Sequence, residues 1–138
     1  MTLMEFLHRV VGLDYRDGGR DWSGVDCWGL IALAYWDVLG VELSDYGDVA
    51  PEDALSVRRA IQGGAAQPPW QPVPDPAPMD VALIRLPHGR TAGHVGLVVP
   101  GGMILHAQRA AGIIQERAAR PTLRPRIIGY VRHESCTS

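Results

Sequence analysis

Six prolines between Pro68 and Pro78 divide this chain into two parts with different hydrophobic periodicity. Before them, apolar residues recur at the spacing of three and four that is typical of helices. After them, short apolar runs are separated by turns that contain glycine and proline. The proline segment has few amide donors, so we expect an extended connector rather than regular structure. Helices followed by a meander of strands predict an α+β fold, with an antiparallel sheet packed on the helices.

Three helices are expected before the prolines. Thr2 and Glu5 form a capping-box pattern that starts a first helix of about ten residues. The second helix should run from Cys27 to about Leu39. It is apolar nearly all round, so we expect it to be the buried central helix. A third, short helix is expected at about 51–62.

The second half of the chain predicts a set of short strands. They are expected at 80–85, 94–99, 103–107, 112–115 and 127–132. A length of 138 residues is ordinary for one compact domain. We therefore expect residues 1–138 to form a single domain, with 136–138 as a mobile tail.

Charge and hydropathy argue against two classes of partner. The net charge of −2 argues against a general nucleic-acid binder, although most acids precede residue 54 and most arginines follow it. We interpret this split as two differently charged faces; a partner-docking face is the weaker alternative. No window holds the roughly 20 apolar residues that span a bilayer, and Glu5 and Arg9 interrupt the N-terminus. We expect synthesis in the cytoplasm without a signal peptide, and no membrane insertion.

Cys27 is the first candidate for chemistry. It follows a glycine-rich loop at 14–24 and opens the buried helix, where unpaired backbone N–H groups and the helix dipole favour negative charge. A thiol there should ionise more easily, and the thiolate is the reactive form. The same N–H groups are suited to holding an oxyanion. This segment alone equally fits a small core cysteine.

His94 and His106 are candidates for the base that a nucleophile needs. Each interrupts an otherwise apolar strand. If residues 100–102 form a three-residue hairpin loop, Val99 pairs with Met103 and His106 becomes the diagonal neighbour of His94 on one face. A second histidine in that place can hold the first in the correct tautomer and orientation.

Two alternatives remain open at this point. A cysteine with two histidines can instead ligate zinc, although Cys27 lies in no CxxC or HxxxH spacing and no fourth ligand suggests itself. A disulfide between Cys27 and Cys136 is also possible. An unpaired Cys27 has the better support, because its surroundings suit a reactive thiol.

Several segments together resemble a known family. The runs YRDGG from Tyr15 and DCWGL from Asp26 resemble the Y-x-x-G-G…D-C-x-G-L signature of the NlpC/P60 cysteine peptidases. PMDVALI, GHVGLVV, ILHA and IGYVRH then resemble later family segments, in family order. The compact form and the closing GYVR pattern look most like the phage tail-associated branch, including relatives from prophages and gene transfer agents.

This resemblance implies a papain-like fold, with Cys27 as nucleophile, His94 as base and His106 orienting it. Tyr15 would place its hydroxyl near the thiolate and the oxyanion. Asp26 would also lie near the oxyanion or the substrate, although its position equally fits a helix cap. The implied reaction is hydrolysis of γ-D-glutamyl–diamino-acid bonds in peptidoglycan stem peptides, through a thioester and without a cofactor.

The resemblance also implies delivery by a phage-like tail, with tail proteins as partners and action on the wall in the periplasm. A structural tail component of the same fold with little activity is one alternative, and an amidase or acyltransferase is another. Two positions depart from the family pattern. Trp28 replaces the serine that often follows the nucleophile, and Met79 replaces the glycine before Asp80, where we expect an effect only on a turn.

Overall fold

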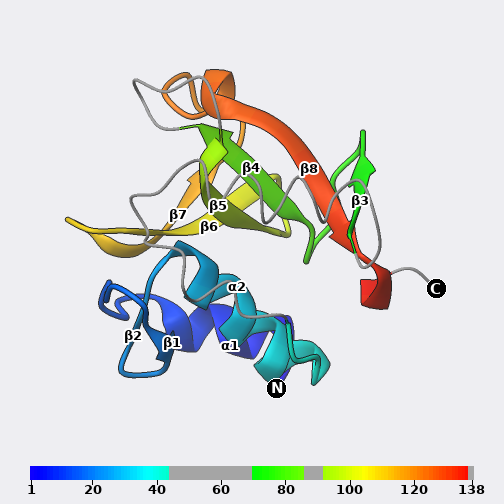
Figure 1. The fold of residues 1–138 in the computed structure, drawn as a ribbon. Coiled ribbons are helices and arrows are strands. Elements are labelled where there is room, and N and C mark those ends of the chain that lie inside the picture. Colours follow the sequence, from blue (N-terminus) through cyan, green and yellow to red (C-terminus); the bar gives the residue numbers. More distant parts are fainter. Residues whose placement is uncertain (44–69, 86–91, 137–138) are drawn as a thin grey trace.

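The computed structural model describes residues 1–43, 70–85 and 92–136, and the helix expected at 51–62 lies outside these ranges. In chain order its elements are α1 (Leu3–Val10), β1 (Arg20–Asp21), β2 (Gly24–Val25), α2 (Cys27–Ala34), η1 (Tyr35–Leu39), β3 (Trp70–Val73), β4 (Val81–Arg85), β5 (Ala92–Val99), β6 (Met103–Gln108), β7 (Gly112–Arg117), η2 (Arg124–Arg126), β8 (Ile127–His133) and η3 (Glu134–Cys136). Helices α1 and α2 lie together on one side of the main sheet (Figure 1). The predicted α+β architecture is confirmed.

The first helix begins where the capping pattern places it. The hydroxyl of Thr2 accepts a hydrogen bond from the backbone N–H of Glu5 at 3.1 Å. Phe6 and Val10 lie one turn apart on the same face of α1 and are fully buried. The helix therefore attaches to the core through one apolar stripe.

The second helix is the central one, as predicted, but its last part is not α-helical. It is α-helical from Cys27 to Ala34 and continues as a π-helical turn over Tyr35–Leu39. Gly40 ends it with a φ of 67°, the left-handed conformation that favours glycine. The hydroxyl of Tyr35 donates to the carbonyl oxygen of Met79 at 2.5 Å, which ties this turn to the sheet.

The main sheet is antiparallel throughout the described strands, in the order β3-β8-β4-β5-β6-β7. The hairpin register predicted from the three-residue loop is confirmed, because Val99 pairs with Met103. Alternate residues of β5 face opposite sides of the sheet. Val95 and Leu97 pack in the large core with α2, whereas Val98 belongs to a smaller cluster on the other face.

The proline segment contains a strand, so the expectation of no regular structure is wrong for Trp70–Val73. This strand, β3, pairs with β8 at one edge of the sheet, and Pro72 lies opposite Val131. An edge strand needs ladder hydrogen bonds on one side only, which is why proline is tolerated there. Trp70 is buried and its ring packs edge-on against those of Tyr35 and His133. Burial of the tryptophan therefore holds the segment to the sheet.

Two residues singled out in the sequence are Cys136 and Met79, and Met79 lies in a turn, as expected. Cys136, expected in a mobile tail, ends η3 with its sulfur 3.7 Å from the hydroxyl of Tyr35. Met79 has a φ of 78° and is the one non-glycine residue in the described ranges with a positive φ. This left-handed turn explains why the family pattern has glycine there.

In the described ranges, every helix is too short or too polar to cross a bilayer.

Gly96 lies in β5 where a side chain has no room. An added Cβ would lie 2.5 Å from Cγ2 of Ile104 and 3.4 Å from Cβ of His106. We therefore expect Gly96→Ala to lower the free energy of unfolding by about 1–3 kcal/mol, the usual cost of overpacking a core. Chemical denaturation followed by circular dichroism measures this difference.

Gly129→Ala is the matched control. Gly129 lies in β8, and apart from its own residue and its two chain neighbours no described atom lies within 4 Å of the position that its Cβ would take. Its free energy of unfolding should stay within about 0.5 kcal/mol of wild type. Equal losses in the two variants would contradict the proposed lack of space at Gly96.

Candidate active site

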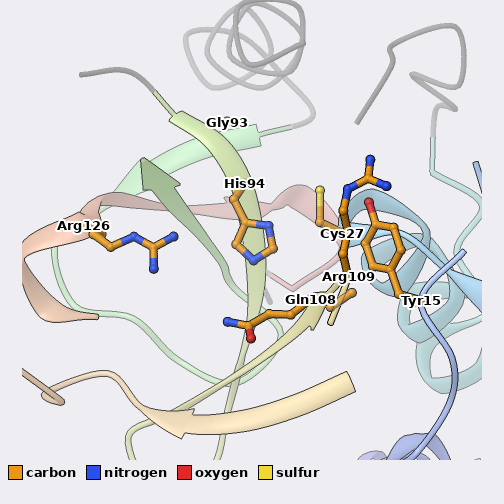
Figure 2. Close-up of a pocket in the computed structure, with 8 residues that line it drawn as sticks. Tyr15, Cys27, Gly93, His94, Gln108, Arg109 and Arg126 are labelled. Carbon is orange, nitrogen blue, oxygen red and sulfur yellow. The ribbon is translucent and has the colours of Figure 1, made fainter. Parts of the chain in front are cut away.

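A pocket of about 210 Å³ lies beside the first residue of α2 and the start of β5 (Figure 2). Its lining residues are Tyr15, Cys27, Gly93, His94, Ala107, Gln108, Arg109 and Arg126. They come from four separate parts of the chain: the loop after α1, the start of α2, the β5–β6 hairpin with the turn that follows β6, and η2. The pocket therefore brings together three of the site residues named from the sequence, Tyr15, Cys27 and His94.

Asp26 fixes the position of Cys27 by capping α2. Its carboxylate accepts hydrogen bonds from the backbone N–H of Gly29 at 2.7 Å and of Gly18 at 3.0 Å. The guanidinium of Arg20 donates to the same carboxylate at 2.7 Å. Asp26 is 3% exposed and is not among the residues that line the pocket. The helix-cap interpretation therefore describes it better than a substrate contact.

The charge state of Cys27 differs from the sequence-based expectation. Burial, followed by the negative charge of Asp26, raises the pKa of the Cys27 thiol to about 11. Hydrogen bonding from the backbone amides of Val95 and Trp28 and the charge of Arg20 act in the opposite direction but do not outweigh burial. The helix N-terminus that was expected to ionise the thiol is itself buried. At neutral pH the thiol is therefore protonated.

His94 and His106 form the pair predicted from their spacing. Nε2 of His94 lies 2.9 Å from Nδ1 of His106, and the rings meet edge-on. Burial, the neighbouring His106 and the charge of Arg126 lower the pKa of His94 to about 3. His94 is therefore a neutral imidazole at neutral pH and can accept a proton. Figure 2 shows one of its ring nitrogens on the side that faces Cys27.

Glu116 extends the histidine pair and was missed in the sequence. Its Oε2 lies 2.6 Å from Nε2 of His106, which is almost fully buried. In the β6–β7 ladder Ile104 pairs with Glu116 and His106 pairs with Ile114, so Glu116 is the diagonal neighbour of His106. The expected strand ends at residue 115, two positions before the end of β7 and one before Glu116. A longer strand with the same turn would have indicated this contact.

Tyr15 reaches the pocket through an isolated parallel bridge with Val25. Burial raises the pKa of Tyr15 to about 12, although the charge of Arg109 lowers it. The phenol therefore stays protonated and can donate a hydrogen bond. The guanidinium of Arg109 lies 5.1 Å from the centre of the Tyr15 ring and pairs with Asp17 at 2.9 Å.

Arg126 is the second cation of the pocket and was also missed in the sequence. Its Nε donates to the backbone carbonyl of Arg85 at 3.0 Å. Among the described residues, no carboxylate oxygen lies within ion-pair distance of it. The charge of this guanidinium therefore faces the pocket and the histidine pair, and no carboxylate of the described residues neutralises it. The sequence showed an arginine-rich second half but not which arginine would reach the site.

Neither alternative role of Cys27 finds support in the described residues. Cys27 and Cys136 are both free thiols, so the possible disulfide between them does not form. Within the described ranges, no three or more histidine, cysteine, aspartate or glutamate side chains gather closely enough to hold a metal ion.

The geometry supplies the parts of covalent acyl transfer. A thiol and a neutral imidazole share one pocket, and a second histidine orients the first. The backbone N–H groups at the start of α2 and the hydroxyl of Tyr15 are donors of the kind that stabilise an oxyanion. These groups come from separate elements that only the fold brings together.

Comparison with solved structures gives a consistent picture of the fold. The NlpC/p60 domain of the peptidoglycan hydrolase SagA superposes with a TM-score of 0.61 at 21% identity, over 94% of both chains. An NLP/P60 protein from Staphylococcus aureus gives 0.65 at 20% identity and one from Bacillus cereus gives 0.67 at 16%. These two matches cover 94% and 95% of this chain but 39% of each relative. At these identities the likeness establishes the fold.

No curated protein matches the sequence. A family model does: the one described as "NlpC/P60 family" matches residues 12–132, which include Tyr15, Cys27, His94, His106 and Glu116. Because this match covers most of the chain and the fold agrees with it, the chain belongs to the NlpC/P60 family.

Proposed function

We propose that this protein is a cysteine peptidase that hydrolyses peptidoglycan stem peptides. The observation that carries the proposal is that Cys27 shares a pocket with His94, whose ring is held by His106 at 2.9 Å. A nucleophile, a base and an orienting residue are the minimum set for this type of catalysis. One of the similar structures is of a peptidoglycan hydrolase, which supports the choice of substrate.

The reaction begins from the neutral thiol and the neutral imidazole. His94 removes the thiol proton as the sulfur of Cys27 attacks the amide carbonyl. The backbone N–H of Cys27 and the hydroxyl of Tyr15 stabilise the oxyanion. His94 then gives its proton to the leaving amine, and a thioester remains. Water, deprotonated by His94, hydrolyses the thioester to the free acid and the thiol.

The bond we propose is the γ-D-glutamyl–diamino-acid amide. A residue linked through its γ-carboxyl keeps its α-carboxylate free, so a substrate of this kind is an anion close to the bond that breaks. The cationic lining from Arg109 and Arg126 supports such a substrate. Charge-assisted hydrogen bonds from guanidinium to carboxylate are among the stronger polar contacts.

We further propose that a phage-like tail carries the enzyme to the wall, where it acts from the periplasmic side. This rests on the likeness of the sequence to tail-associated members of the family. Co-purification of the protein with tail particles, and tail genes beside its coding sequence, would support it.

Purified muropeptides test the proposed reaction. Wild-type protein should release products cut between D-glutamate and the diamino acid, as identified by mass spectrometry. Cys27→Ala should abolish them, because the nucleophile is lost while little core volume changes. EDTA should have no effect on the wild type, since the thiol rather than a metal carries the reaction.

Cys136→Ser is the control for this substitution, because Cys136 lies outside the pocket lining. It should keep wild-type activity. Full activity in Cys27→Ala would rule out the mechanism. A folded wild type that leaves every muropeptide intact would favour the structural tail component.

The pH dependence of alkylation tests the charge state of the site. In the Cys136→Ser background, iodoacetamide modifies Cys27 alone. Below a thiol pKa of about 11, the thiolate fraction rises about tenfold per pH unit. The alkylation rate, measured by mass spectrometry, should therefore keep rising from about pH 6 to about pH 9. A plateau already reached near neutral pH would indicate a preformed thiolate–imidazolium pair instead.

Arg126→Gln tests the cationic lining. Loss of a charged hydrogen bond to the substrate should lower kcat/KM on an acidic muropeptide by about ten- to a hundredfold. Arg124→Gln, which changes an exposed arginine of the same turn outside the pocket lining, is the control and should behave as wild type. Similar kcat/KM values for the two variants would remove Arg126 from substrate binding.

A further inference from the structure

The histidine pair continues into a chain of polar contacts that ends at the surface. His94 contacts His106, and His106 contacts Oε2 of Glu116. The other carboxylate oxygen of Glu116, Oε1, accepts from the guanidinium of Arg120 at 2.7 Å. Glu116 is largely buried, with 13% of its side chain exposed, whereas Arg120 is 58% exposed. The contacts therefore run from the pocket through a largely buried carboxylate to an exposed arginine.

The directions of these hydrogen bonds follow from what each group can donate. An ionised carboxylate only accepts, so Nε2 of His106 must carry the proton that it shares with Glu116. Burial lowers the pKa of His106, although Glu116 raises it, so the ring is neutral at neutral pH. A neutral imidazole has one N–H. Nδ1 of His106 is then bare and can only accept.

The same reasoning extends to His94. Because Nδ1 of His106 accepts, Nε2 of His94 must donate across the 2.9 Å contact. His94 is neutral too, so its remaining nitrogen, Nδ1, is bare. Figure 2 shows a ring nitrogen of His94 on the side facing Cys27. A bare nitrogen there can take the thiol proton, whereas a protonated one cannot.

We propose that Glu116 is a positioning residue that fixes the proton of His94 on Nε2 by acting through His106. This deepens the proposed function and rests on it. Without an acceptor at position 116, His106 is free to carry its proton on Nδ1. His94 Nε2 must then accept, and its own proton moves to Nδ1, where it blocks the transfer from Cys27. Glu116 thus selects the reactive tautomer without touching substrate.

Other charged groups near the pair do not substitute for Glu116. Arg126 lies near both rings and only donates, so it cannot accept the proton of His106 Nε2. Arg120 is likewise a donor and reaches the pair only through Glu116. Within the described residues, Glu116 is the one carboxylate hydrogen-bonded to either histidine.

Nitrogen-15 NMR of the histidine rings at neutral pH tests this directly, because it distinguishes protonated from bare ring nitrogens. In the wild type we expect both His94 and His106 to carry the proton on Nε2. Glu116→Leu removes the acceptor and should shift both rings toward the other tautomer. In the same variant kcat should fall by about 10²–10⁴, the scale for losing a base or its correct tautomer. KM should stay within roughly twofold, since Glu116 does not line the pocket.

Glu116→Gln keeps an oxygen that can accept from His106, and the exposed Arg120 is able to turn away from the new amide. This variant should keep the wild-type tautomers and remain within about tenfold of wild-type kcat, because its amide oxygen still accepts the proton of His106 Nε2. Gln115→Leu is the matched control, because Gln115 is the exposed neighbour on the same strand. It should leave tautomers and kcat unchanged.

Wild-type tautomers and kcat in Glu116→Leu would overturn the proposal. If that variant does not fold, the wild-type spectrum still decides, because a proton on Nδ1 of His94 would overturn the proposal by itself. The tautomers are read without substrate. A wild type with the expected tautomers that cleaves no muropeptide would therefore reject the proposed function and leave the positioning role of Glu116 intact.

Discussion

The carboxylate of Asp26 is the contact on which the site depends. It accepts from Gly18 and Arg20 in the glycine-rich loop and from Gly29 in the first turn of α2. One buried group thereby joins the loop that carries Tyr15 to the helix that carries Cys27. Loss of this carboxylate would take its acceptor from the buried N–H of Gly29, which is more costly than the gain from forming such a bond.

Strand register explains how much of the site the sequence could predict. The loop at 100–102 fixes the pairing of Val99 with Met103, and period-two alternation then places His94 and His106 on one face. The same alternation in the β6–β7 hairpin places Glu116 diagonally opposite His106. It was missed because nothing in the local sequence marks where β7 ends. The positions of Arg109 and Arg126 depend on tertiary packing and have no periodic signal.

Two further differences between prediction and structure arise from burial, which a local sequence pattern does not reveal. The helix N-terminus predicted an acidic thiol at Cys27, yet the cost of desolvating the charge dominates in the folded chain. The prolines predicted irregular structure, yet Trp70 buries enough apolar surface to hold β3 at the sheet edge. In both places a tertiary environment overrides a sound local preference.

The neutral state of Cys27 affects how readily its thiol is oxidised. Oxidation to sulfenic and then sulfinic acid proceeds from the thiolate and requires access. A thiol with a pKa of about 11 that is 5% exposed offers little of either. The same burial that keeps the Cys27 thiol protonated therefore protects it from oxidants. We therefore expect Cys27 to stay reduced in surroundings where an exposed thiolate would be oxidised.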